Sequence, residues 1–215
     1  MPYINPYIAP VEEHKNIETD ITKIAQNKGK WKEFFWNTNP VRLEIWTGLG
    51  NFFSWEVASN PEINFLGMEI KFKRCFTTAE KTLKKWGKNF FIVKEFAQKL
   101  DEFIADSELQ QVYIFFPDPW GKKDRQKKHR VLQAEFLTLI HKKLEKRWKI
   151  IFKTDHEDYF KDTLEVLEEI NLFKQEHKSF DYEKELSQFF DKQNMTEFEV
   201  IFSEKKVCYI ELIKE

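Results

Sequence analysis

Short apolar runs alternate with longer amphipathic stretches along most of the chain. Each run is apolar, β-branched or aromatic and is bounded by polar residues, glycine or proline, which is typical of buried strands. These predicted strands are residues 41–45, 63–68, 90–93, 111–116 and 149–153. The stretches between them place apolar residues at three- and four-residue spacing, which is typical of helices. The predicted helices are residues 52–58, 72–86, 134–144 and 159–170.

The order of these elements predicts an α/β fold. Strict alternation of strand and helix implies βαβ units with right-handed crossovers and a mostly parallel sheet with helices on both faces. Residues 199–202 and 207–212 are expected to form an antiparallel strand pair at the C-terminus. Residues 1–30 are polar and turn-rich, so we expect an N-terminal arm followed by a single domain over residues 31–215.

Composition and charge fit one globular domain. Of the 215 residues, 41% are hydrophobic and 22 are Phe, which indicates a large aromatic core. The net charge is −1, so any nucleic acid would have to bind a local basic patch. Cys75 and Cys208 lack the spacing of a zinc site or a disulfide framework, and no export signal or membrane span is indicated. We therefore expect a cytoplasmic protein without a metal.

A glycine-containing turn follows the first predicted strand. Gly48 and Gly50 lack a Cβ, so the turn can bring backbone N–H groups close to a nucleotide-like ligand, although a plain tight turn has the same pattern. Glu69 ends the second strand, where an acidic side chain can accept hydrogen bonds from ribose hydroxyls. Glu44, near the end of the first strand, is placed to hold a cationic amino group. No GK[ST] sequence follows, which disfavours nucleotide hydrolysis, whereas hydride transfer stays open from this end alone.

The fourth predicted strand ends in the segment Phe116-Pro117-Asp118-Pro119-Trp120. The two prolines restrict the backbone on either side of Asp118, so its carboxylate is held stiffly. The segment could be only a rigid strand exit. It is followed at once by a basic run that consists of Lys122, Lys123, Arg125, Lys127, Lys128, His129 and Arg130. A basic run is usually a solvated face, but beside a cofactor site it can bind phosphates, while Trp120 offers a ring for stacking.

Three segments together resemble the signatures of the bacterial tRNA (guanine-N7)-methyltransferase family. They are Pro-Asp-Pro-Trp-x-Lys-Lys from Pro117, Phe152-Lys153-Thr154-Asp155, and Thr196-Glu197-Phe198-Glu199, and the resemblance extends from about residue 27 to the end. The resemblance implies a Rossmann-like class I methyltransferase that uses S-adenosyl-L-methionine. Its implied substrate is tRNA, and the implied reaction is methylation of a guanine at N7, in the variable loop.

The resemblance also implies roles for individual residues. Asp118 would be catalytic. The cofactor site would comprise Glu44, Gly48, Gly50, Glu69, Glu95, Phe96 and Asp118, and the guanine would face Lys122, Asp155, Thr196, Glu197, Phe198 and Glu199. Guanine N7 carries a free lone pair at neutral pH, so no general base is needed. Positioning is then the main task, and it can contribute about 7–11 kcal/mol.

Two residues depart from the family pattern on the cofactor side. Trp46 stands at the first glycine of the family's Glu-x-Gly-x-Gly-x-Gly motif. Phe96 stands where the family usually has Asp, so a side-chain contact to the adenine would be lost unless Glu95 replaces it. These departures support an alternative, a tRNA-binding protein on a methyltransferase fold with weak or lost cofactor binding. A small-molecule methyltransferase is a further alternative, but it would leave the basic run without a role.

Overall fold

The computed structural model describes residues 5–121, 124–186, 188 and 192–215. They form two compact units that each contain helices and four strands. Unit 1 comprises Met1–Ala105 and Gln193–Glu197, and unit 2 comprises Asp106–Lys192 and Phe198–Glu215.

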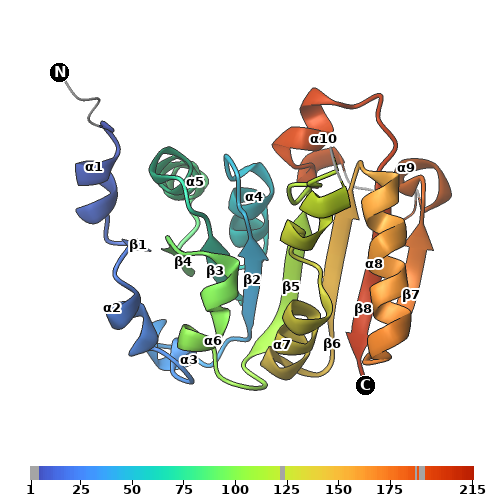
Figure 1. The fold of residues 1–215 in the computed structure, drawn as a ribbon. Coiled ribbons are helices and arrows are strands. Elements are labelled where there is room, and N and C mark those ends of the chain that lie inside the picture. Colours follow the sequence, from blue (N-terminus) through green and yellow to red (C-terminus); the bar gives the residue numbers. More distant parts are fainter. Residues whose placement is uncertain (1–4, 122–123, 187, 189–191) are drawn as a thin grey trace. The chain divides into compact units, whose positions relative to one another are not determined.

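Unit 1 has a parallel sheet with the strand order β1-β4-β3-β2 (Figure 1). The register pairs Ile45 with Met68 and Met68 with Val93, so the carboxyl ends of β2, β3 and β4 are level. Every residue of β3 and β4 is buried, as expected of strands covered on both faces. The strands are β1 (Ile17–Glu18), β2 (Val41–Ile45), β3 (Asn64–Met68) and β4 (Phe90–Val93).

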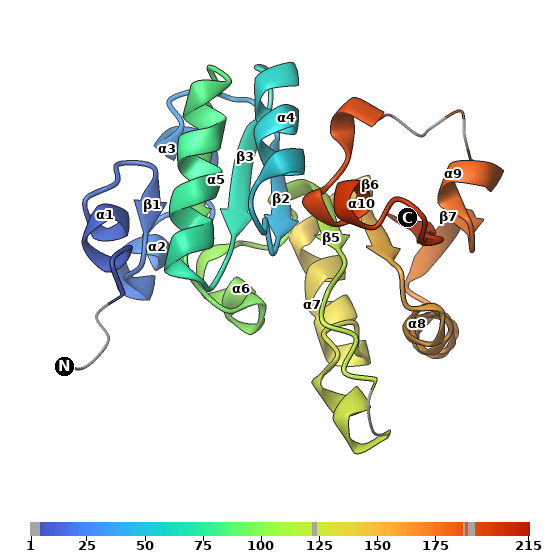
Figure 2. The same ribbon diagram turned by 90° about the horizontal axis from the view of Figure 1, so that it is seen from above.

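Helices cover both faces of this sheet. Helices α4 (Asn51–Ser59) and α5 (Phe72–Lys84) pack against each other on one face, and α6 (Leu100–Phe103) lies on the other (Figure 2). The core is rich in rings, and the fully buried Trp31 donates a hydrogen bond from Nε1 to the carbonyl of Phe103 at 2.9 Å. The remaining short helices are α1 (Ile8–Glu12), α2 (Ile21–Ala25), α3 (Trp31–Phe34) and η1 (Ala97–Lys99).

The described part of the first 30 residues contributes to unit 1. Strand β1 pairs in parallel with β4 through Ile17 and Ile92. Helix α2 begins after Asp20, whose side chain accepts a hydrogen bond from the backbone N of Thr22 at 2.9 Å. The expected division of the chain into an arm and one domain stays a prediction.

Unit 2 contains a mixed sheet with the strand order β5-β6-β8-β7 (Figure 1). Strands β5 and β6 are parallel, and β8 is antiparallel to both β6 and β7. Helices α7 and α8 contact β6 and each other. The elements of this unit are β5 (Leu109–Phe115), η2 (Asp124–His129), α7 (Ala134–Lys143), β6 (Leu144–Thr154), α8 (Glu157–Ile170), β7 (Phe173–Ser179), α9 (Tyr182–Glu185) and β8 (Cys208–Lys214). Two short helices, η4 (Lys192–Asn194) and α10 (Glu197–Ile201), lie where the chain passes between the units.

The predicted C-terminal antiparallel pair is present, but one of its strands was assigned wrongly. Residues 199–202 lie in and just after α10, and the antiparallel neighbours of β8 are β6 and β7. Phe198 and Phe202 are four residues apart and bring their ring centroids to 4.6 Å, which is helical spacing. Strand β7 was missed because its sequence, FKQEHKS, is almost entirely polar, as edge strands often are.

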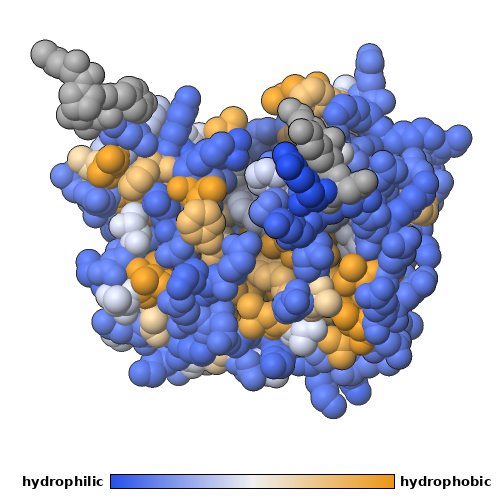
Figure 3. Space-filling view, in the orientation of Figure 1, coloured by the Kyte–Doolittle hydropathy of each residue, from blue (hydrophilic) through white to orange (hydrophobic). Residues whose placement is uncertain are grey.

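Most of the face shown in Figure 3 is hydrophilic. Trp36 and Trp86 are the most exposed of the large hydrophobic residues described, at 94% and 86%. Each stands two residues after a helix, at positive φ of 56° and 65°, a position that usually takes glycine. No helix among the described residues is long and apolar enough to span a membrane.

Candidate cofactor site and guanine-facing residues

Acidic residues gather at the carboxyl edge of the unit 1 sheet, where ligands bind in parallel α/β proteins. Glu44 and Glu69, at the ends of β2 and β3, are 3% and 1% exposed. Glu95 follows β4, is half-buried, and accepts a hydrogen bond from the backbone N of Phe96 at 2.8 Å. The ring of Phe96 is 59% exposed, which is unusual for Phe and leaves an apolar surface beside these carboxylates. The level strand ends therefore bring these four of the seven predicted cofactor residues to one edge.

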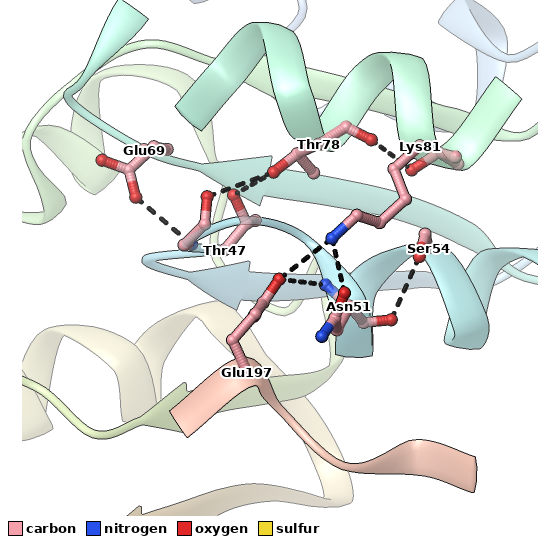
Figure 4. Close-up of polar contacts among 9 residues, drawn as sticks. Thr47, Asn51, Ser54, Glu69, Thr78, Lys81 and Glu197 are labelled. Atoms are coloured by element: carbon pink, nitrogen blue, oxygen red, sulfur yellow. Dashed lines mark hydrogen bonds and ion pairs between the residues drawn. The ribbon is translucent and has the colours of Figure 1, made fainter. Parts of the chain in front are cut away.

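Glu69 is tied to the glycine turn (Figure 4). Its Oε1 accepts hydrogen bonds from the backbone N atoms of Ile70 at 2.9 Å and Lys71 at 3.0 Å. Its Oε2 accepts a longer bond from the backbone N of Gly48 at 3.3 Å and lies 3.8 Å from the guanidinium of Arg74. These donors fix the orientation of the carboxylate.

The turn itself is left-handed at three residues. The φ angles are 64° at Trp46, 58° at Gly48 and 76° at Gly50. A Cβ at Gly50 would come within 2.7 Å of Thr78 Oγ1, because α5 packs directly on the turn. A Cβ at Gly48 would meet only Glu197, at 3.9 Å, so the turn is open to a ligand there. Trp46 thus keeps the backbone conformation of the glycine that it replaces, and this conformation costs a residue with a Cβ about 1–2 kcal/mol.

Glu197 also contacts this turn, although sequence analysis placed it opposite the guanine (Figure 4). Its Oε1 accepts a hydrogen bond from the backbone N of Asn51 at 2.8 Å and lies 3.2 Å from Lys81 Nζ. Lys81 also donates to Asn51 Oδ1 at 2.5 Å. Sequence reasoning missed Asn51, Lys81 and Thr78, because residues on α4 and α5 carry only the ordinary signal of an amphipathic helix.

In unit 2, β5 and β6 end together, with Phe115 paired to Lys153. The segment from Phe116 to Trp120 and the residues Thr154 and Asp155 therefore leave the sheet at the same edge. Asp118 is exposed, whereas Pro117 is buried. Phe116 and Trp120 have φ of 49° and 44°, a region that large side chains rarely adopt. Backbone strain of this kind is typical of functional sites.

Arg130 shows that part of the basic run is structural. Its side chain is 1% exposed, its Nε donates to the carbonyl of Pro119 at 2.7 Å, and its guanidinium pairs with Asp162. The guanidinium also lies 4.6 Å from the ring of Tyr159. Burial raises the pKa of Tyr159 to about 12, so this phenol stays neutral at physiological pH. Arg130 therefore holds the strand exit instead of facing solvent.

The other basic residues differ in exposure. Arg125, Lys128 and His129 are exposed, whereas the half-buried Lys127 lies 3.0 Å from Asp162. The predicted guanine contact Lys122 and its neighbour Lys123 fall outside the described residues. Exposed positive charge thus remains at Arg125 and Lys128, and the exposed His129 lies in the same segment.

Three of the remaining guanine-facing predictions, Phe198, Glu199 and Asp155, lie near the end of β6 in unit 2. Phe198 stacks on Phe116 at 4.4 Å between ring centroids. Glu199 is 4% exposed, and its Oε1 accepts a hydrogen bond from Lys153 Nζ at 2.8 Å. Asp155 pairs with Lys205 at 2.6 Å, and the same Lys205 lies 5.3 Å from the ring of Phe198. Thr196, in unit 1, is buried.

Sequence analysis missed two cations in this group. Lys153 lies under the rings of Phe115 and Tyr182, at 4.9 and 4.8 Å, and neutralises the buried Glu199. Lys205 binds Asp155. The Phe-Lys-Thr-Asp motif contains Lys153 but gives no sign of its partner, which lies 46 positions away.

Two solved structures that resemble this chain in fold are described as methyltransferases. One, described as an antibiotic-related methyltransferase, matches with a TM-score of 0.56 and 15% identity over 94% of this chain and 97% of the other. A 16S rRNA (adenine(1408)-N(1))-methyltransferase from Catenulisporales acidiphilia, solved with the cosubstrate SAM, matches with a TM-score of 0.59 and 12% identity over 92% of both chains. At this identity the likeness defines the fold alone, and it confirms the predicted Rossmann-like α/β fold.

Sequence comparison gives the family. The family described as "Putative methyltransferase" matches residues 38–212. The tRNA (guanine-N(7)-)-methyltransferase of Lachnoclostridium phytofermentans is 34% identical over 178 residues, which are 83% of this chain and 81% of that protein. A bifunctional glycosyltransferase/methyltransferase of Fusobacterium nucleatum is 33% identical over 200 residues, and this chain spans 30% of its length. The chain belongs to the tRNA (guanine-N(7)-)-methyltransferase family, as its motifs indicated.

Proposed function

We propose that this protein transfers a methyl group from S-adenosyl-L-methionine to N7 of a guanine in tRNA. Two features support the proposal, each within its own unit: the acidic, glycine-lined strand edge of unit 1, and the exposed Asp118 in the strained strand exit of unit 2. Relatives that bear the name tRNA (guanine-N(7)-)-methyltransferase are 34–37% identical to this chain.

The residues of unit 1 fit this cofactor. The buried carboxylate of Glu69 sits against Gly48, where it can accept hydrogen bonds from ribose hydroxyls. The open side of Gly48 admits a ligand close to the backbone. Glu44 offers a buried negative charge for the amino group, and the exposed ring of Phe96 can pack on the adenine in place of a polar contact. S-adenosyl-L-methionine would supply an electrophilic methyl group carried on a sulfonium.

The chain's task in the reaction is to hold guanine N7 in line with that methyl group. Asp118 orients the guanine by accepting hydrogen bonds from its N–H groups, and it stabilises the positive charge that develops on the purine. Asp155 and the segment from Thr196 to Glu199 bind the guanine and its surroundings, together with Lys122. The exposed Arg125 and Lys128 bind tRNA phosphates.

The test is methyl transfer from labelled cofactor to unmodified tRNA, followed by mapping of the modified base. Asp118→Ala should abolish turnover and leave the unfolding curve unchanged, because this side chain is exposed. Asp158→Ala, which removes an exposed carboxylate from α8, is the matched control and should retain activity. A product other than N7-methylguanine, or near-normal activity of Asp118→Ala, would overturn the proposal.

The alternative, a tRNA-binding protein with lost cofactor binding, is favoured by one observation, the strained Trp46 in the cofactor turn. Calorimetry with S-adenosyl-L-methionine separates the two functions. Micromolar binding supports the enzyme, whereas tRNA binding with no cofactor binding at millimolar concentration supports the alternative.

A further inference from the structure

The segment Gln193–Glu197 belongs to unit 1, although the chain on both sides of it belongs to unit 2. It contacts helix α4 at two places. Asn194 Nδ2 donates to Glu56 Oε1 at 3.0 Å, and Glu197 Oε1 accepts from the backbone N of Asn51 at 2.8 Å. These partners are 138 and 146 positions apart in the sequence. A distant segment therefore holds the helix that follows the cofactor turn.

Glu197 supplies a cap that α4 cannot supply for itself. The residue before α4 is Gly50, which the turn requires because of its φ of 76°, and glycine has no side chain to bind the first N–H groups of the helix. A carboxylate at a helix N-terminus is further stabilised by the helix dipole. Lys81 on α5 completes the network, because it binds both Glu197 and the side chain of Asn51 (Figure 4).

The two residues that follow Glu197 have partners of a different kind. Phe198 stacks on Phe116 in the strand exit that carries Asp118, and Glu199 binds Lys153 at the end of β6. Three consecutive residues thus have three different partners. Glu197 binds Asn51 at the start of α4, Phe198 stacks on Phe116, and Glu199 binds Lys153. Glu197 is bonded covalently to Phe198, so a movement of Asn51 that Glu197 follows is passed on to Phe198.

We propose that Glu197 is a positioning residue that couples the cofactor turn to the guanine-binding segment, so that cofactor and tRNA bind cooperatively. This inference rests on the proposed function. In this inference Glu197 contacts the cofactor turn, whereas Thr196, Phe198 and Glu199 of the same motif face the guanine. A ligand that orders the turn fixes Glu197, and the segment then needs less ordering when tRNA binds.

The test measures binding in both directions. The affinity of unmodified tRNA is measured with and without saturating S-adenosylhomocysteine, and the affinity of S-adenosylhomocysteine with and without tRNA. In the wild-type protein each ligand should tighten the other by the same factor, about 5- to 150-fold. In Glu197→Gln, which keeps the size of the side chain but removes its charge, the factor should fall toward one.

Further variants separate coupling from a merely structural cap. Lys81→Met should lower the coupling factor as Glu197→Gln does, and the double variant should be no worse than either single one, because each of the three removes the charge pair between Glu197 and Lys81. Glu204→Gln changes an exposed glutamate after α10 and should keep the wild-type factor. Thermal unfolding of each variant shows whether stability has changed independently.

The inference is overturned if wild-type protein binds the two ligands independently, or if Glu197→Gln and Lys81→Met both retain the wild-type factor. Its failure is distinct from failure of the proposed function. Independent binding together with N7-methylguanine formation removes only the inference, whereas absence of S-adenosylhomocysteine binding removes both.

Discussion

The conformation of Trp46 can be tested by comparing two substitutions, Trp46→Gly and Trp46→Ala. Both remove the indole, but only alanine retains a Cβ at the φ of 64°. The left-handed region costs alanine about 1–2 kcal/mol, whereas glycine adopts it freely. The greater backbone entropy of glycine in the unfolded chain offsets about 0.5–1 kcal/mol of this. Trp46→Gly should therefore be about 1 kcal/mol more stable than Trp46→Ala, which reverses the usual order of these two residues.

Urea and thermal unfolding of the two variants measure this difference. For a chain of 215 residues, about 1 kcal/mol corresponds to a shift in Tm of roughly 2–4 °C. If Trp46→Ala is as stable as Trp46→Gly or more so, the left-handed conformation is wrong. Calorimetry adds a functional measurement. Trp46→Gly should bind S-adenosyl-L-methionine more tightly than wild type, and weaker binding would mean that the indole contributes to the site.

Three further predictions concern the packing around the site. Gly50→Ala should lose more than the roughly 1–2 kcal/mol of a left-handed alanine, because its Cβ would approach Thr78 to 2.7 Å; a smaller loss in urea unfolding would contradict the contact. Arg130→Met should lose about 1.5–3 kcal/mol with its charge-assisted hydrogen bond to the strand exit, whereas Lys128→Met, at an exposed position, should unfold like wild type in the same assay. Burial raises the pKa of Cys75 from 9.0 to about 12, so the folded protein should resist alkylation at mildly alkaline pH, and rapid modification would refute its burial. Because only the unfolded thiol then ionises, this group's contribution to stability should be lost as the pH rises above 9.0.

The sequence was sufficient to predict the strands in the interior of the fold. The predicted bounds of β2 and β4 match the structure, because a strand buried on both faces is apolar from end to end. It was insufficient for β7, whose polar residues suit an edge and give no hydrophobic period. Residues 199–202 have an apolar content that fits a strand or a helix, and α10 is too short for periodicity to decide between the two.

In the candidate site, too, the sequence predicts some residues and contacts but not others. Glu69 and Asp118 could be predicted because strand ends at the carboxyl edge of a parallel sheet are common positions for ligand-binding residues. The contact between Glu197 and Asn51 could not, since no local pattern relates residues 146 positions apart. Arg130 was predicted to belong to a basic run that can bind phosphates, because charge alone does not reveal that a guanidinium lies against Tyr159.

Of the four tryptophans with positive φ, Trp36, Trp46 and Trp86 stand where glycine is the usual residue, and this has a consequence for the gene. After α3, Trp36 N donates to the carbonyl of Glu33 and Asn37 N to that of Lys32; after α5, Trp86 N donates to the carbonyl of Leu83 and Gly87 N to that of Thr82. These two hydrogen bonds form the type of helix C-terminus in which glycine is the usual residue at the left-handed position. Trp46 stands at the first glycine of the family's glycine motif.

The chain has 7 Trp and 6 Gly, where average usage of about 7% would give about 15 Gly. The codon UGA is read as tryptophan in some genetic codes and as glycine in others. If UGA stands at these three codons and the cell reads it as glycine, the turn becomes Glu-x-Gly-x-Gly-x-Gly and all three strained positions relax. Peptide masses of the protein purified from its own cells would show which residue is made there.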